Sequence, residues 1–219
     1  MIKIENTKIF NITRAVYSAR NAMNSWNRSD SDLDSDILGP NDYNLAIRLA
    51  RSGTDHRKYL RMITVIVDIT APLYFWKEHD QYKVGTVSNS SSTMHKIHAK
   101  EFALEDFSHE HLTVVSTDSL KRTINDLNSA REGYFDEQIK QNPELRKEFW
   151  WQMIQLLPSS YNQRRTVQMN YEVLANIYKS RKGHKLDEWK EFCEWIESLP
   201  YSELITWRLK SPSRSADNS

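Results

Sequence analysis

Cysteine, glycine and proline are scarce in this sequence. Cys193 is the single cysteine among 219 residues, so no disulfide can form within the chain, which suits a reducing compartment. Only five glycines and six prolines are present, and no Gly/Ser-rich linker divides the chain. We therefore expect a single domain over residues 1–209, followed by a flexible C-terminal tail over residues 210–219.

Long apolar runs and an excess of charge are also missing. No stretch approaches the roughly 20 apolar residues that a membrane-spanning helix needs, and the N-terminus has no signal-peptide pattern. The chain has 30 basic and 29 acidic residues, a formal net charge of +1, which gives no general attraction to nucleic acid or to an anionic membrane. These absences predict a cytoplasmic protein with no membrane partner and no nucleic-acid polymer as partner.

Strand patterns occur in the first half of the chain and helical patterns in the second. Residues 63–70 alternate β-branched apolar and polar positions, which predicts a strand, and Ile2–Ile12 is a second candidate. Helices are predicted over Thr13–Ser25, Asp42–Ser52, Leu73–Asp80, Asp118 to about Lys140, Pro143–Leu156, Arg164–Arg181 and Asp187–Leu199. The stretch Val84–Thr93 is small and polar, which predicts a loop or irregular strand. The expected fold class is α+β.

Familiar chemical motifs are incomplete in this sequence. Asp alternates over residues 30–36 as in a calcium-binding loop, but Ser35 and Asn41 stand where that loop needs Gly and a bidentate Glu. His95 and His98 are one helical turn apart, yet no third or fourth zinc ligand accompanies them. Phosphate-binding loops, the dinucleotide glycine fingerprint and GxSxG are missing too. We predict no metal site.

In the stretch from His56 to Met94, a His-containing segment is followed by the strand pattern of residues 63–70, the Ala71–Pro72 step and a short predicted helix. This order of segments resembles the core of flavin-dependent thymidylate synthases. In that family a His-containing segment precedes a strand, an Ala-Pro step, a short helix and the signature RHRxxSxNExSxR. Here His56 meets the family's His, Ala71–Pro72 the Ala-Pro step, and Lys77 with Glu78 the Arg-Gln before the signature. The signature itself falls on Gln81, Tyr82, Lys83, Thr86, Ser88, Asn89, Ser91 and Thr93.

Both ends of the chain extend this resemblance. Ala19–Arg20 is similar to the family's N-terminal Ala-Arg segment, and Asn170–Arg181 to the helix that starts Asn-Leu-Arg. His184–Trp189 lies over the family's His-Ala-Gln segment, and the whole is most similar to a divergent, phage-type branch. The resemblance implies an α+β fold with a mixed or antiparallel sheet and a helical C-terminal half. It also implies a homotetramer whose subunits share the active sites.

The resemblance further implies the reaction and its participants. Family members bind FAD, use methylene-tetrahydrofolate and NADPH as co-substrates, and methylate C5 of a pyrimidine deoxynucleotide monophosphate without a cysteine nucleophile. The implied cofactor-binding residues are His56, Lys77, Gln81, Tyr82, Lys83, Thr86, Asn89, Asn170 and His184, with His56 the candidate catalytic residue. The implied substrate-binding residues are Ser91, Ser92, Thr93, Arg164, Arg165, Glu172 and Arg181.

Several departures from the family pattern alter the expected charge of the site. Glu172 stands where the family often has an arginine that contacts the nucleotide, and Thr93 replaces another arginine. Two like charges about 4 Å apart repel by roughly 4 kcal/mol at an effective dielectric constant near 20. If Glu172 faces the pocket, we therefore expect a basic residue to compensate its charge. The candidates are Arg164 and Arg165, on the same predicted helix as Glu172, with Lys77 and Arg181 behind them.

Alternatives remain open at several of these positions. Arg164 and Arg165 either meet the phosphate or are solvated charges, and Tyr82 either stacks on the flavin or packs in the core. The tryptophans Trp150 and Trp151 either stack bases or pack in a core or subunit interface. The function is accordingly either methylation of dUMP or a related nucleotide such as dCMP, or binding of nucleotides or partners by a catalytically altered homologue.

Overall fold

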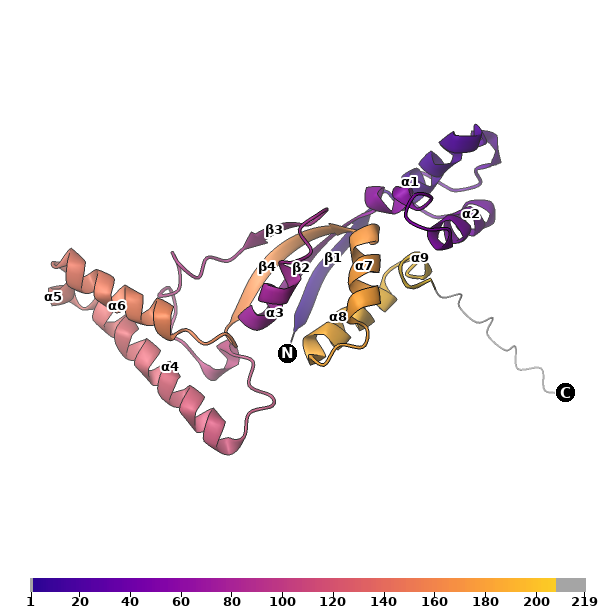
Figure 1. The fold of residues 1–219 in the computed structure, drawn as a ribbon. Coiled ribbons are helices and arrows are strands. Elements are labelled where there is room, and N and C mark those ends of the chain that lie inside the picture. The colour runs from indigo at the N-terminus through magenta and orange to yellow at the C-terminus, as the bar shows by residue number, and fades with distance from the viewer. Residues whose placement is uncertain (1, 208–219) are drawn as a thin grey trace. The chain divides into compact units, whose positions relative to one another are not determined.

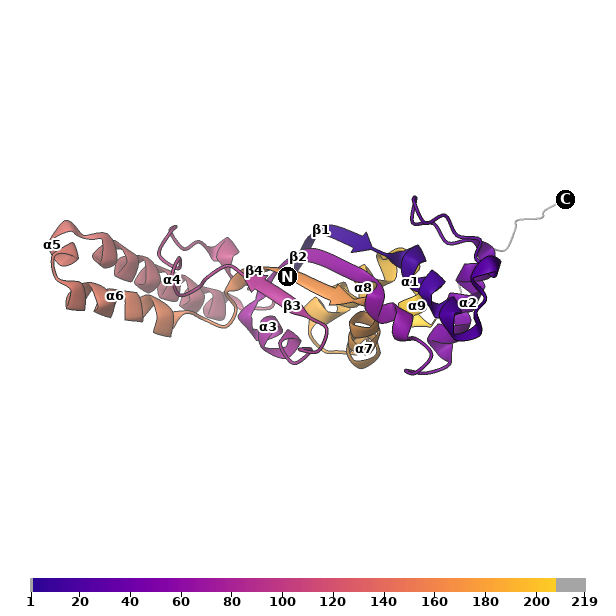
Figure 2. The same cartoon turned by 90° about the horizontal axis from the view of Figure 1, so that it is seen from above.

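The structure, a computed structural model that describes residues 2–207, contains a four-stranded antiparallel sheet. The strands are β1 (Lys3–Phe10), β2 (Thr64–Pro72), β3 (Val87–Ser90) and β4 (Asn162–Asn170). They lie side by side in the order β1-β2-β4-β3 (Figure 2). Val65, Val67 and Ile69 of β2 are fully buried at every second position, as the alternating sequence predicts. The predicted tail at 210–219 lies outside the described residues.

Helices make up most of the remaining described chain (Figure 1). They are α1 (Ile12–Ser18), α2 (Pro40–Arg51), α3 (Leu73–His79), α4 (Val114–Phe135), α5 (Glu137–Lys140), α6 (Pro143–Leu156), α7 (Tyr171–Arg181), α8 (Asp187–Ser198) and α9 (Glu203–Thr206). The α+β class and the helical C-terminal half predicted from the sequence are confirmed. No helix among residues 2–207 is long and apolar enough to cross a membrane.

Three predicted helices differ from the structure. The predicted helix Thr13–Ser25 is α-helical only to Ser18 and continues as a 3-10 turn over Ala19–Met23. The predicted helix Arg164–Arg181 is wrong in its first third, because residues up to Asn170 form β4 and only Tyr171–Arg181 is helical. Burial of Gln163, Val167 and Met169 in β4 has a two-residue period that its polar composition conceals. Asp118 does not cap α4, which begins four residues earlier, where the Thr113 hydroxyl accepts from the backbone N–H of Ser116.

Residue contacts group the chain into two compact units, and both contribute residues to the strands. The first unit contains Ile69–Gln81 and Asn89–Thr166. In it α4 and α6 form an antiparallel helical hairpin (Figure 1), whose core is the buried set Ile97, Phe102, Phe107, Leu120, Ile124, Leu127, Ala130 and Met153. The second unit contains Ile4–Asp68, Tyr82–Ser88 and the chain from Val167. There α7 packs against α8 and α9, and the buried side chains include Leu174, Ile177, Trp189, Phe192 and Leu204.

Candidate functional site

A cavity of about 890 Å³ in the second unit contains one of the predicted site residues, His56. Its walls come from the 3-10 turn Ala19–Met23, from α2 and from the segment that carries His56. We call it the arginine cavity, because Arg20, Arg28 and Arg48 line it and no Asp or Glu does. His56 also lines a neighbouring hollow of about 300 Å³, beside Asp55 and Lys58. Its side chain is therefore open to both spaces.

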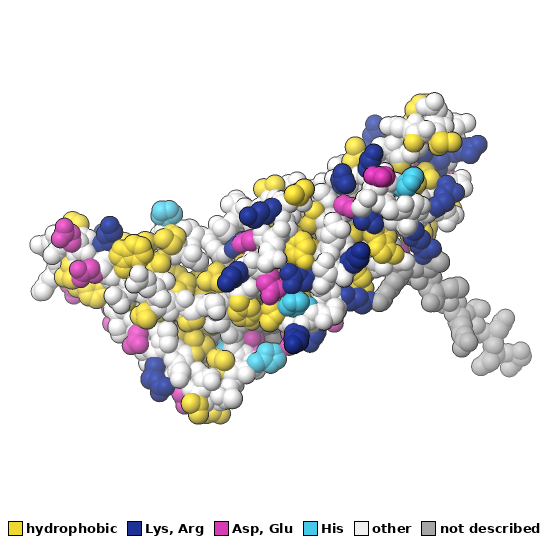
Figure 3. Space-filling model, viewed as in Figure 1, with side chains coloured by type: hydrophobic (Ala, Val, Ile, Leu, Met, Phe, Trp, Pro, Cys, Tyr) yellow, Lys and Arg dark blue, Asp and Glu magenta, His cyan; other side chains and the backbone are white. Residues whose placement is uncertain are grey.

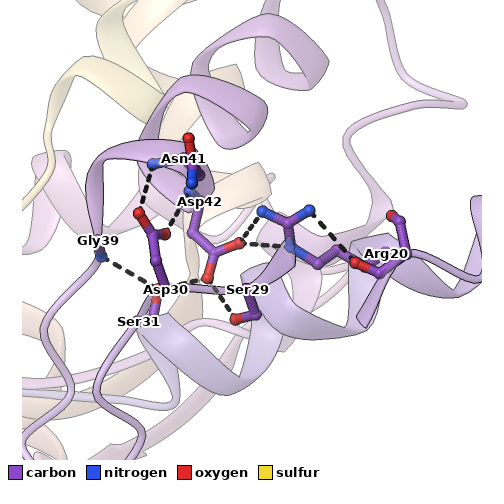
Figure 4. Close-up of polar contacts among 8 residues, drawn as sticks. Arg20, Ser29, Asp30, Ser31, Gly39, Asn41 and Asp42 are labelled. Atoms are coloured by element: carbon purple, nitrogen blue, oxygen red, sulfur yellow. Dashed lines mark hydrogen bonds and ion pairs between the residues drawn. The ribbon is translucent and has the colours of Figure 1, made fainter. Parts of the chain in front are cut away.

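Arg20 is fixed in the wall of the arginine cavity by a buried ion pair (Figure 4). Its Nε donates to Asp42 Oδ1 at 2.6 Å, and the two residues are only 5% and 0% exposed. The hydroxyls of Ser29 and Ser31 each donate to Asp42 Oδ2 at 2.6 Å. Burial pushes the pKa of Asp42 upward, but these hydroxyls and Arg20 together hold it below its usual value. The charge of Arg20 is thus balanced within the wall.

The alternating aspartates serve as structural caps rather than as a cluster of ligands. Asp30 accepts from the backbone N–H groups of Asn41 and Asp42 at 2.9 and 3.0 Å, which caps the N-terminus of α2 (Figure 4). Gly39 allows this close approach, since a Cβ there would lie 2.2 Å from the carbonyl oxygen of Asp30. Asp36 caps α1 in the same way, through the N–H of Thr13 at 2.7 Å. The loop thereby fixes α2, which lines the arginine cavity, and α1, which leads into the 3-10 turn of its wall.

Arg28 and Arg48 keep uncompensated charges on the arginine cavity. Both are exposed, and neither forms an ion pair with any of the residues 2–207. Figure 3 shows Lys and Arg side chains gathered over the α1–α2 part of the chain. Together with His56, these two guanidinium groups make the cavity suited to an anionic ligand, and arginine binds phosphate oxygens with particularly good geometry.

Two further predicted residues, Thr86 and Asn170, line a pocket of about 220 Å³ beside Arg61. Asn170 caps α7, because its side-chain oxygen accepts from the N–H of Val173 at 2.9 Å. Gly85 has a φ of +79°, and a Cβ there would lie 2.8 Å from Asn170 Nδ2, so the loop can pass this closely only as glycine. The Thr86 hydroxyl is buried with no hydrogen-bond partner among the described residues, which leaves it available to a ligand or water.

Three predicted residues from separate segments meet around Trp189. Arg181 Nε donates to the hydroxyl of Tyr82 at 2.9 Å, and its guanidinium lies 4.8 Å from the centre of the Trp189 ring. The rings of Tyr82 and His184 lie 6.1 and 6.4 Å from that of Trp189, both edge-on. Trp189 is fully buried and stands at the end of the HKLDEW segment. Sequence reasoning did not assign it to the site, although its position next to the matched segment is a usable signal.

In the first unit Ser91, Arg164 and Arg165 are brought together by β4. The N–H of Ser91 donates to the carbonyl of Arg164 at 2.9 Å, and Gln163 Nε2 donates to the carbonyl of Ser91 at 2.7 Å. Arg165 donates to Gln163 Oε1 at 3.0 Å and pairs with Asp80 at 2.7 Å. Its guanidinium also lies 4.3 Å from the centre of the Trp76 ring. Gln163 and Asp80 were not among the predicted site residues.

The other predicted residues stand apart from these groups. Thr93 is half-buried and Ser92 is exposed, with its hydroxyl accepting from the N–H of His95 at 2.9 Å. The following predicted cofactor-binding residues are exposed: Lys77, Gln81, Lys83 and Asn89.

The expected compensation of Glu172 by Arg164 and Arg165 is wrong, because Glu172 pairs with Arg57. Arg57 Nε lies 2.9 Å from Glu172 Oε2 and 3.1 Å from Oε1, and Glu172 is only 7% exposed. Arg164 and Arg165 belong to the strand β4, whereas Glu172 belongs to the first turn of α7. The carboxylate charge is therefore neutralised locally by a residue next to His56.

The fold of this chain is similar to that of the flavin-dependent thymidylate synthases. A solved structure of the flavin-dependent thymidylate synthase ThyX from Helicobacter pylori, complexed with FAD and dUMP, matches with a TM-score of 0.65 and 16% identity over 95% of this chain and 99% of that one. A second structure of that enzyme, also with FAD and dUMP, gives 0.67 and 16% over 96% and 100%.

A third solved structure is that of the UMP/dUMP methylase PolB from Streptomyces cacaoi, bound with 5-Br dUMP. It matches with a TM-score of 0.55 and 15% identity over 94% of this chain and 95% of that one. No protein-family model matches the chain, and no curated protein matches it. The predicted resemblance is thus confirmed in the fold over nearly the whole chain.

Proposed function

We propose that this chain is a divergent, phage-type member of the flavin-dependent thymidylate synthase family that methylates a pyrimidine deoxynucleotide monophosphate at C5. The observation that carries this proposal is the end-to-end fold match to one enzyme solved with FAD and dUMP and to a UMP/dUMP methylase. The proposed substrate is dUMP or a related nucleotide such as dCMP. Methylene-tetrahydrofolate is the proposed one-carbon donor and NADPH the proposed reductant, and the working assembly is a cytoplasmic homotetramer.

The residues of the second unit fit FAD as a ligand. FAD carries a diphosphate, and the arginine cavity presents Arg28 and Arg48 without a carboxylate on its lining. Its volume of about 890 Å³ lies within the range of cofactor and ligand sites. The buried, unpartnered hydroxyl of Thr86 offers a further hydrogen bond to a bound group. His56, Thr86 and Asn170 are the residues that we assign to holding the cofactor.

The chain's own contribution is to bind, to orient and to balance charge. FAD, when bound, would supply the redox chemistry of the methylation, as cofactors do in general. Arg28 and Arg48 neutralise phosphate, and His56 offers its ring nitrogens as hydrogen-bonding groups to a ligand in the cavity. The Arg57–Glu172 pair removes a carboxylate charge that would otherwise repel a nucleotide phosphate. Ser91, Arg164 and Arg165 are the proposed nucleotide-phosphate contacts of the first unit. In the second unit Tyr82 and Trp189 fix the side chain of Arg181, which is also a proposed substrate-binding residue.

The test is reconstitution of the purified protein with FAD, followed by gel filtration and an absorbance spectrum. We expect bound flavin in the unaltered protein and its loss in the double variant R28Q/R48Q. The matched control is R14Q, since Arg14 is an exposed arginine on α1 that stacks on Tyr17 and does not line the cavity. Flavin retained equally by all three proteins would refute the assignment of the arginine cavity.

Turnover is measured separately from binding. The reconstituted protein receives NADPH, methylene-tetrahydrofolate and either dUMP or dCMP, and mass spectrometry detects a methyl group added to the base. Methylation of one nucleotide supports the proposal and identifies the substrate. Nucleotide binding without flavin binding would instead support the alternative function, that of a catalytically altered homologue that acts as a nucleotide-binding or interaction protein.

A further inference from the structure

The connected end of the helical hairpin, where α5 links α4 to α6, contains a second, smaller concave site. It lies between the C-terminal end of α4, the short helix α5 and the first turns of α6, and its volume is about 380 Å³. Its lining residues are Tyr134, Lys140, Pro143, Arg146, Lys147 and Trp150. We call it the hairpin pocket. None of its residues belongs to the set assigned to methylation, so it is independent of the proposed function.

The hairpin pocket has an aromatic wall of fixed geometry. The guanidinium of Arg146 lies 4.2 Å from the centre of the Tyr134 ring, a stacking arrangement that leaves the in-plane N–H groups free to donate. Trp150 is oriented by its indole N–H, which donates to the carbonyl of Met94 at 2.9 Å. Arg146 Nε is buried and has no hydrogen-bond partner among residues 2–207. A buried guanidinium nitrogen of this kind is costly unless an acceptor meets it.

The charges around the hairpin pocket are mostly positive. Lys140 pairs with Glu137 at 2.5 Å, whereas Arg146 and Lys147 have no ion pair within the described part of the chain. His98, whose ring lies 4.5 Å from that of Tyr134, has a pKa lowered by its burial and then by the charges of nearby cations, Arg146 first. The His98 Nδ1 atom is also buried without a partner. The local field is therefore one that attracts an anion.

We propose that the hairpin pocket is a second nucleotide site, which binds a flat aromatic ring carrying a phosphate group. Trp150 would stack on the ring, since any base can stack on an aromatic face, while Tyr134 holds the Arg146 guanidinium beside it. Arg146 and Lys147 would bind the phosphate, for which the guanidinium fork is well matched. About 380 Å³ suits one nucleoside monophosphate, since small-molecule sites occupy roughly 300–1,000 Å³. A nucleic-acid strand would need a longer basic track than these two cations provide.

The test is calorimetric titration of the full chain with dUMP, dTMP, AMP and inorganic phosphate. The variants are K147Q, which changes an exposed side chain, and R146Q/K147Q. The control is K121Q, which removes the same charge from the exposed face of α4, where Lys121 lies 4.0 Å from Asp118. We expect K147Q to weaken binding at one site about tenfold, which corresponds to the loss of one charge-assisted contact. The double variant should lose that site, and K121Q should bind as the unaltered protein does.

A second measurement places the ligand. In an NMR spectrum, the indole N–H signal of Trp150 is identified by its absence in W150F. This signal should shift when nucleotide is added to the unaltered protein, and the same addition to K147Q should leave it close to its ligand-free position. Unchanged affinity in both charge variants, or inorganic phosphate binding as tightly as the nucleotides, would overturn the proposal. Preferential binding of a single-stranded oligonucleotide would also overturn it. The flavin-site variant R28Q/R48Q should retain the hairpin pocket, so failure of either site is distinguishable from failure of the other.

Discussion

Replacement of Asp42 by alanine should destabilise the second unit severely. The substitution leaves the Arg20 guanidinium buried with only a 3.5 Å contact to the carbonyl of Ser25, and it deprives the hydroxyls of Ser29 and Ser31 of their acceptor. Breaking a buried ion pair by removing one partner costs about 3–5 kcal/mol. For a chain of this length that corresponds to a fall of roughly 6–20 °C in Tm, at about 2–4 °C per kcal/mol.

The pH dependence of this effect follows from the direction of the Asp42 pKa. Because the folded-state pKa lies below the unfolded value, the carboxylate contributes its full stability above the usual carboxyl pKa of about 4. That contribution is lost as the pH falls through the still lower folded-state pKa. The difference in unfolding free energy between the unaltered protein and Asp42→Asn should therefore be largest near neutral pH and shrink in acid.

Urea unfolding followed by circular dichroism measures these differences. The matched control is Asp34→Ala, which removes an exposed carboxylate from the same loop and should change stability by less than about 0.5 kcal/mol. The double replacement Arg20→Met with Asp42→Leu should recover much of the loss, because no buried charge then remains unpaired. A cost below about 1 kcal/mol for Asp42→Ala would refute the reasoning.

Three further outcomes are expected. Gly85→Ala should lower the free energy of unfolding in urea by about 1–3 kcal/mol. The loss should exceed that of Gly53→Ala, since Gly53 also has a positive φ but a Cβ there would meet nothing within 4 Å. Equal losses would contradict the close-contact argument. Arg57→Met should cost about 3 kcal/mol by leaving Glu172 buried and unpaired, and adding Glu172→Gln should restore part of it. Burial raises the pKa of Cys193 to about 11, so iodoacetamide should modify it only after unfolding; fast labelling of the native protein would show an open thiol.

Local pattern was sufficient to predict several elements. The alternation over residues 63–70 predicted β2, and proline at the first helical position predicted the start of α6 at Pro143. The polar stretch Val84–Thr93 contains β3, whose four residues are all exposed; three of them are small and polar, and the fourth is Val87. Residue matches to a family also identified the fold correctly. These features depend on neighbours in sequence, which is why the sequence was enough.

Only the tertiary structure determined how charges are paired and which residues share a cavity. Arg57 and Glu172 are 115 positions apart. The sequence of β4 does not reveal a strand, because its exposed positions are polar and one of its buried positions is Gln163. The arginine cavity likewise joins Arg28, Arg48 and His56 from separate segments. A sequence specifies which groups carry charge and which avoid water. Whether a given charge is neutralised or left open to a ligand depends on distances of a few ångströms, and those are fixed only when the chain packs.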